Sequence, residues 1–214
     1  EGDIIIVNPN IEPQSGDFYG AGGVLSLLIL GLGLVAAVFH LGKPEYFLTR
    51  AWRGMSQWRT SWLSRELIAL PAFMGAVFLY TVAQYAGMTD TLFTIGGKVP
   101  MDGTLLMGVI GAVLAFVLYI ATAMIYASVR FFQEWHTPLT VANYLLLGLA
   151  SGFTLAAAFA AWMGVDLVGM FAGWAVVFTI MGAITRVASL YRNSKIEHKS
   201  TLQTAIGVRH TTIR

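Results

Sequence analysis

The sequence contains no cysteine and few charged residues. Without cysteine, the chain cannot form disulfide bonds or bind zinc or iron–sulfur clusters through thiolates. Charged residues make up 11% of the 214 positions, against about 25% in an average soluble domain. A water-facing surface cannot be built from so few charges, so the composition excludes a soluble globular protein.

The apolar residues, 57% of the chain, occur in long unbroken runs. Runs of about 20 apolar residues match the hydrocarbon core of a bilayer, which is about 30 Å thick. The pattern therefore predicts an all-α, polytopic transmembrane helix bundle with five helices, over residues 19–41, 63–87, 104–126, 139–163 and 167–186. Glycines in the first helix, and Gly148 with Gly152 in the fourth, predict close packing between helices.

The segments outside the predicted helices are polar. Residues 1–18 form an acidic extramembrane segment, residues 88–103 a turn-rich loop, and residues 187–214 a basic tail. The chain begins at Glu1 without the basic region or cleavage pattern of a signal peptide. We therefore expect it to be part of a longer chain.

The basic residues are distributed unequally between the two sides of the predicted membrane. Twelve of the thirteen Lys and Arg residues lie in residues 42–66, 127–138 and 186–214, which share one side, and only Lys98 lies on the other. Cytoplasmic loops of membrane proteins carry such an excess of Lys and Arg. The sequence thus predicts a multi-pass membrane protein whose connector, residues 40–66, and C-terminal tail are cytoplasmic.

Two ionisable residues, His40 and Glu66, bracket the connector at this edge. Histidine has an ordinary pKa of about 6.5 and suits proton exchange with the cytoplasm, although it is also favourable at a helix C-terminus. An acid is favourable at a helix N-terminus, but acids at membrane depth usually face the bundle interior and mark a proton or ligand path. Their shared edge favours a functional role for both residues.

Other candidate residues lie at the same edge. Arg130, Glu134 and His136 are predicted there, with a solvated loop as the alternative. In the connector, aromatic residues such as Trp58 are typical of an interfacial belt. The basic residues there are orientation signals and lipid contacts or, together with Trp58, a docking surface for an acidic partner; they are Arg50, Arg53 and Arg59. Asn143, inside the fourth helix, predicts an interhelical hydrogen bond.

The histidines argue against a haem held between helices. The four histidines are His40, His136, His198 and His210, and none is predicted in the middle of a helix. We therefore expect neither haem nor a metal site in this chain.

Two stretches around the connector resemble the membrane-anchor subunit family of dimethyl sulfoxide reductase (DmsC-type). They are His-Leu-Gly-Lys-Pro at residues 40–44 and Trp-Arg-Thr-Ser-Trp-Leu-Ser-Arg-Glu at residues 58–66. Two later stretches, residues 134–139 and 200–210, are similar to the sulfite dehydrogenase branch of that family. The resemblance covers residues 19–210.

The resemblance implies an anchor of eight helices that holds a molybdopterin catalytic subunit and a four-cluster iron–sulfur subunit against the membrane. It also implies electron exchange with a quinone, ubiquinone or menaquinone. His40 and Glu66 match the family's histidine and acid that are linked to quinol binding. Because five helices are predicted here, the resemblance implies one helix before residue 1 and two after residue 214.

Together, the resemblance and the charge pattern predict an anchor that passes electrons from cytoplasmic sulfite oxidation to the membrane quinone pool. Dimethyl sulfoxide reductases are expected to dock on the periplasmic side, so a cytoplasmic connector favours the sulfite-oxidising branch. We expect Arg65, Arg130 and His136 to join His40 and Glu66 in quinone binding and proton transfer. Membrane lipid surrounds such a chain, and no nucleic-acid partner is expected.

Three alternatives stay open at this point. The first is a dimethyl sulfoxide reductase-type anchor that oxidises quinol. The second is a purely structural anchor without a quinone site. The third is a fragment of a transporter, for which the sequence offers no visible inverted repeat.

Overall fold

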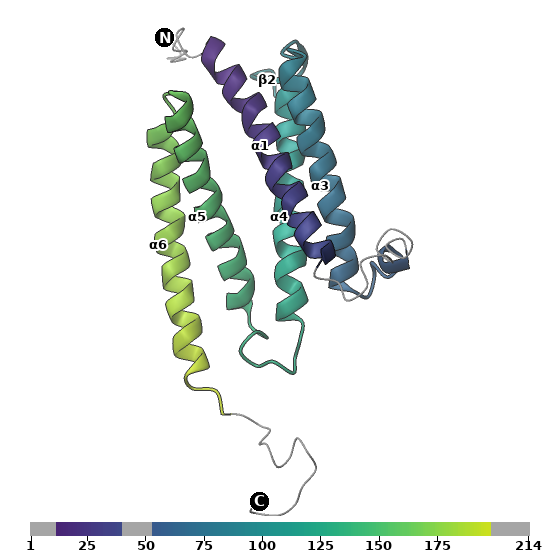
Figure 1. Ribbon diagram of the computed structural model, residues 1–214, viewed down its shortest axis with the longest axis vertical. Coiled ribbons are helices and arrows are strands. Elements are labelled where there is room, and N and C mark those ends of the chain that lie inside the picture. The colour runs from purple at the N-terminus through teal and green to yellow at the C-terminus, as the bar shows by residue number, and fades with distance from the viewer. Residues whose placement is uncertain (1–11, 40–52, 198–214) are drawn as a thin grey trace, which may run out of the picture.

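The computed structural model describes residues 12–39 and 53–197. Within these ranges, five helices are long and apolar enough to cross a membrane, which confirms the predicted class. They are α1 (Glu12–Phe39), α3 (Trp62–Tyr85), α4 (Gly103–Ala127), α5 (Pro138–Met163) and α6 (Val168–Asn193). In Figure 1, α1, α3 and α4 pack together, and α5 and α6 form an antiparallel pair beside them.

The two ends of the bundle carry different segments. At one end, α3 and α5 begin and α4 and α6 end; we call it the connector edge. At the opposite end, α1 begins, a small hairpin joins α3 to α4, and a tight turn joins α5 to α6; we call it the hairpin edge. This alternation is the one that the predicted spans require.

Two helix ends differ most from the predicted bounds. Helix α1 begins at Glu12, ahead of the expected residue 19, and Pro13 stands in its first turn, where proline is tolerated. Helix α6 continues through Arg186 to Asn193, beyond the expected end. The apolar run marks the thickness of the membrane, and polar residues extend a helix past it without penalty. Residues 40 and 41 of the first predicted helix lie outside the described ranges.

Local signals explain the other helix ends. Ser61 caps α3, and its hydroxyl oxygen accepts the Ser64 N–H at 3.4 Å. Thr137 caps α5 in the same way, and Pro138 occupies the first helical position, where no N–H is needed. Helix α5 ends at Gly164, whose φ of +70° lies in the left-handed region that glycine adopts without strain.

The predicted loop between the second and third spans contains a hairpin that was not expected from the sequence. Strand β1 (Thr91–Ile95) pairs antiparallel with β2 (Val99–Asp102). Gly96 and Gly97, with φ of +60° and +68°, make the turn. The strands contain β-branched and aromatic residues such as Thr91, Phe93 and Val99, which favour extended backbone. Strands of four and five residues are too short to give a clear alternating pattern, so the sequence indicates only the glycine turn between them.

The buried residues of the bundle are small. Among the residues that the structure describes, nine of the twelve buried hydrophobic residues are alanine, while large apolar side chains such as Leu32 and Trp162 are exposed. Close approach of backbones through small residues drives helix association in membranes, because lipid is as apolar as leucine. The tightest approach joins α1 to α3, where Gly23 faces the side chain of Thr81. Gly148 likewise faces the Tyr119 ring of α4, whereas a Cβ at Gly152 would meet no atom within 4 Å.

Asp102 ties the hairpin to α4. Its Oδ1 accepts the backbone N–H of Leu105 and the hydroxyl of Thr104, both at 2.7 Å. These bonds, chiefly the one from the Leu105 N–H, hold the pKa of the carboxyl below its ordinary 3.8. Because the pKa is lowered in the folded state, the bonds stabilise fully above the ordinary pKa, and this contribution is lost as pH falls through the folded value.

We expect Asp102→Ala to destabilise the protein by about 1 kcal/mol at neutral pH, the usual cost of losing a helix N-cap. The difference from wild type should shrink as the pH falls below the ordinary pKa of 3.8 and through the lower pKa of the folded wild-type carboxyl. Thermal unfolding in detergent across this pH range measures the effect. Asp90→Ala, in the same loop, is the matched control and should be near neutral; an equal loss from both variants would contradict the capping role.

Candidate functional site at the connector edge

Glu66 lies near the start of α3, where that helix packs against the end of α4. Its carboxylate is half-buried, and Oε1 accepts a hydrogen bond of 2.5 Å from the hydroxyl of Thr122 on α4. Tyr144, on α5, is close enough for an electrostatic interaction with the carboxylate. Glu66 therefore points between helices and not toward the lipid, as acids at membrane depth usually do.

A pair of tyrosines continues from Glu66 across the bundle. The rings of Tyr126 on α4 and Tyr144 on α5 are stacked, with centroids 5.5 Å apart and planes at 20°. Trp135, from the loop between α4 and α5, packs edge-on against Tyr126 at 5.5 Å and 80°. Three helices and one loop thus join around an aromatic group beside the carboxylate.

The tyrosine pair forms one wall of a cavity of about 360 Å³, which we call the connector-edge cavity. Small-molecule sites typically enclose about 300–1,000 Å³. Its lining is mixed, with aromatic faces and several hydrogen-bonding or charged side chains. The lining residues are Tyr126, Glu134, Trp135, Thr140, Asn143, Tyr144, Arg186, Ser189, Leu190 and Asn193.

Asn143 anchors the floor of this cavity. Its amide Nδ2 donates to the Ser189 hydroxyl at 2.8 Å, and its Oδ1 accepts from the Thr185 hydroxyl at 2.7 Å. Both partners are on α6, so the predicted interhelical hydrogen bond is confirmed. At the rim, the Arg192 guanidinium donates to the Gln133 carbonyl at 3.0 Å and ties α6 to the loop that carries Trp135.

The sequence matches the DMSO reductase anchor subunit (DmsC) family over residues 15–210, nearly the whole chain. The chain belongs to this family. It is also 51% identical over 212 residues to the C subunit of sulfite dehydrogenase from Allochromatium vinosum. That alignment covers 99% of the chain and 64% of the relative, so the chain spans less than two thirds of the relative's length. No solved structure matches the chain.

Arg65 of this DmsC-family chain lies next to Glu66 in sequence but faces the connector. Its Nε donates to the Trp58 carbonyl at 2.9 Å, and its Nη2 donates to the Arg59 carbonyl at 3.1 Å. The guanidinium also stacks 4.0 Å from the Trp62 ring centroid. In this geometry Arg65 fixes the shape of residues 58–62, and its predicted part in quinone binding stays a prediction.

His136 and Arg130 occupy the loop between α4 and α5. The His136 Nδ1 lies 2.7 Å from the carbonyl oxygen of Ala127, the last residue of α4. Nδ1 is the donor in this bond, because a carbonyl oxygen only accepts, and Nε2 is left to face the surroundings. Arg130 is exposed and does not line the connector-edge cavity. Their predicted part in quinone binding stays a prediction.

The predicted docking residues that the structure describes lie on the surface of the connector. Arg53 and Arg59 are exposed, and the Arg59 guanidinium lies 5.3 Å from the ring centroid of Trp58, which is itself 52% exposed. His40 and Arg50 fall outside the described residues. The quinone-site prediction for His40 and the docking prediction for Arg50 therefore stay predictions.

Sequence reasoning missed several members of this site, above all Thr122, Tyr126 and Tyr144. The sequence assigns no role to either tyrosine, because both fall near the ends of apolar runs, where tyrosine is common in any membrane protein. Thr122 is one hydroxyl in an apolar helix, and such a hydroxyl commonly bonds the carbonyl one turn back. The available signal was the adjacent polar pair Asn143 and Tyr144, which is unusual in the first half of a membrane span.

Proposed function

We propose that this chain is the quinone-reactive membrane anchor of a molybdopterin and iron–sulfur oxidoreductase. In this complex, electrons pass from cytoplasmic sulfite oxidation in a partner subunit, through an iron–sulfur subunit, to quinone in the bacterial inner membrane. Membership of the anchor family and the likeness to a sulfite dehydrogenase subunit support this proposal. The observation that carries the quinone site is the Glu66 carboxylate, held by Thr122 beside the tyrosine-lined cavity.

The connector-edge cavity has the chemistry that a quinone head group needs. A quinone presents a flat ring with two carbonyl oxygens that accept hydrogen bonds. Tyr126, Tyr144 and Trp135 supply aromatic faces for the ring. Hydroxyl, amide and guanidinium groups of Tyr144, Asn143 and Arg186 supply donors for the oxygens.

Quinone reduction takes up two electrons and two protons, and the chain supplies groups that move the protons. Thr122 occupies Oε1 of Glu66, which leaves Oε2 to exchange a proton. The stacked rings of Tyr126 and Tyr144 line the cavity next to the α3–α4 interface that holds Glu66, so in the proposal these three groups form the path for protons. In the proposal, Glu66 holds the proton, the tyrosines carry it, and His40 donates a hydrogen bond to a quinone oxygen.

The charge distribution supports a cytoplasmic connector edge. This edge carries Arg53, Arg59, Arg65 and Arg186, while most acids of the chain lie at the other end. The exposed pair Arg53 and Arg59, with Trp58, offers a basic surface for an acidic iron–sulfur partner. Electrons would then reach the cavity from the side at which protons are also available.

The proposal is tested on the complex purified from native membranes. We expect it to reduce both ferricyanide and a short-chain ubiquinone when sulfite is added, and we expect a complex stripped of the anchor to reduce ferricyanide only. Sulfite-dependent reduction of dye without any reduction of quinone would show a purely structural anchor. Oxidation of added quinol coupled to dimethyl sulfoxide, without sulfite turnover, would show the opposite electron direction.

A further inference from the structure

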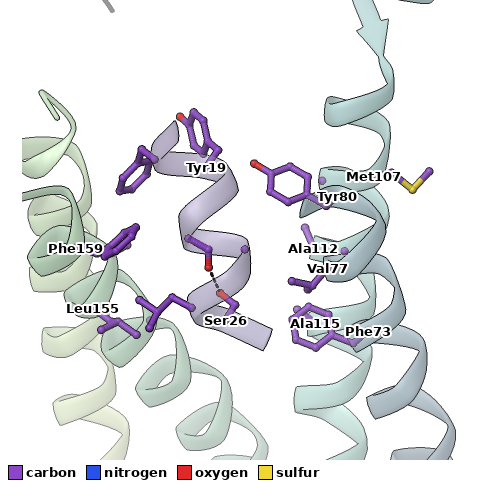
Figure 2. A pocket seen from close by; sticks show the side chains of 18 of the residues that line it. Tyr19, Ser26, Phe73, Val77, Tyr80, Met107, Ala112, Ala115, Leu155 and Phe159 are labelled. Atoms are coloured by element: carbon purple, nitrogen blue, oxygen red, sulfur yellow. Dashed lines mark hydrogen bonds between the residues drawn. The ribbon is translucent and has the colours of Figure 1, made fainter. Parts of the chain in front are cut away.

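A second and larger cavity lies in the other half of the bundle, toward the hairpin edge. Its volume is about 500 Å³, and residues of α1, α3, α4, α5 and α6 line it. Figure 2 shows Phe159 and Leu155 of α5 on one side and Val77, Phe73 and Ala115 on the other, with the first turns of α1 between them. The lining is almost entirely apolar, so an empty cavity of this kind would stay dry and take up hydrocarbon in preference to water.

Two of the glycines that line this hairpin-edge cavity, Gly111 and Gly152, face open space. Gly111 is buried, yet a Cβ built on it would meet no atom within 4 Å; Gly152 is exposed, and a Cβ there would also meet no atom within 4 Å. Protein interiors are close-packed, so a buried backbone with nothing in front of it indicates room for something else. Within the membrane, the hydrocarbon chains of the surrounding lipids are available to fill this space.

Two tyrosines lie at the mouth of this cavity, and two aspartates are adjacent in sequence to Phe18 and to residues packed around it. Tyr19 and Tyr80 lie at its hairpin-edge end, at the level where tyrosines usually meet lipid head groups. Asp17 immediately precedes the lining residue Phe18. Asp166 lies between Val165 and Leu167, which pack around Phe18. Both carboxylates belong to exposed residues.

The charge at this edge selects among lipid head groups. The described side chains here include Asp17, Asp90, Asp102 and Asp166, against the single base Lys98. An anionic head group, as in phosphatidylglycerol or cardiolipin, would meet like charge at the mouth. A head group with an ammonium would meet opposite charge there.

We propose that the hairpin-edge cavity binds one acyl chain of a phosphatidylethanolamine-type lipid, with the ammonium facing Asp17 and Asp166. The lipid fills the space between α1 and the α5–α6 pair, which touch mainly through the cluster around Phe18. It holds these two parts of the bundle together from the hairpin edge. This site is separate from the connector-edge cavity, so the lipid proposal can be tested independently of the proposed quinone chemistry.

The first test fills the cavity. Gly111→Leu with Gly152→Leu should displace the acyl chain without a clash, because open space lies in front of both residues. The whole complex is purified in mild detergent, and its lipids are extracted and quantified by mass spectrometry. We expect phosphatidylethanolamine to be retained by wild type and by the control Gly173→Leu, which faces open space outside the cavity, and to be lost from the double variant. Equal retention in all three proteins would overturn the proposal.

The second test addresses the head group and leaves the cavity intact. Delipidated complex is mixed with liposomes of equal parts phosphatidylethanolamine and phosphatidylglycerol, reisolated and analysed. We expect phosphatidylethanolamine to be enriched on wild type, and this preference to disappear in Asp17→Asn with Asp166→Asn. Enrichment of phosphatidylglycerol, or recovery of quinone as the bound molecule, would refute the assignment.

Discussion

Glu66→Gln is expected to lower quinone-linked turnover of the complex by a factor of about 100 or more, the range lost when a group that transfers protons is removed. Dye-linked turnover by the partner subunits should stay unchanged, because it does not use the cavity. Glutamine retains an oxygen that accepts the Thr122 hydroxyl, so the contact between α3 and α4 survives. What it loses is the ability to hold and release a proton.

The measurement compares sulfite-dependent reduction of a short-chain quinone with sulfite-dependent reduction of ferricyanide in the same preparations. Asp90→Asn, the same chemical change at the hairpin edge, is the matched control and should leave both activities intact. Thr122→Val should cost less than Glu66→Gln, since it frees the carboxylate but does not remove it. If Glu66→Gln reduces quinone at the wild-type rate in an assembled complex, the site lies elsewhere and Glu66 is a structural acid.

The second large effect concerns stability. Gly23→Ala is expected to destabilise the protein by about 1–3 kcal/mol, the usual cost of forcing extra atoms into a packed interface. A Cβ at this position would lie 3.2 Å from the Thr81 Cβ and closer still to its hydroxyl oxygen. Thr81 is buried, and its hydroxyl donates to the Val77 carbonyl at 2.7 Å. It cannot swing away, so α1 must move off α3.

Thermal unfolding in detergent measures this loss, and α1 provides its own control. Gly31→Ala makes the same substitution on the same helix, where a Cβ meets no atom within 4 Å, and should be neutral or slightly stabilising. Adding Thr81→Ala to Gly23→Ala removes the obstructing atoms and should restore part of the stability. Equal unfolding temperatures for Gly23→Ala and Gly31→Ala would show that α1 and α3 do not pack closely at Gly23.

The sequence alone was sufficient for the spans, their alternation and the edge that Glu66 occupies, because hydrocarbon thickness and the Lys and Arg distribution report these directly. It was insufficient for the rotation of each helix about its axis. In a soluble helix the apolar stripe marks the inner face, whereas here lipid and interior are equally apolar. Only Asn143, a polar side chain that must find a partner, revealed its direction in advance, and its bonds to α6 confirm that inference.

The same limit explains the arrangement of the candidate site. Arg65 and His136 share an edge with Glu66, but each turns to nearby backbone carbonyls, at Trp58 and Ala127 respectively. The position of a residue in the sequence defines how deep in the membrane it lies. Which neighbour its side chain contacts depends also on the rotation of its helix about the helix axis and on the path of the connecting loop. Thr122 and Tyr144 are close to Glu66 because the faces of α4 and α5 that carry them are turned toward α3. No local sequence pattern predicts this orientation.

The placement of Glu66, the tyrosine pair and the cavity at one edge has an energetic consequence. Moving one charge across the whole membrane costs or yields about 2.3 kcal/mol for each 100 mV of potential. If electrons and protons both reach the cavity from the connector side, neither crosses an appreciable part of the membrane's electric field. Turnover would then move no net charge across the membrane. It would produce quinol without contributing to the membrane potential, and a high membrane potential would not slow it.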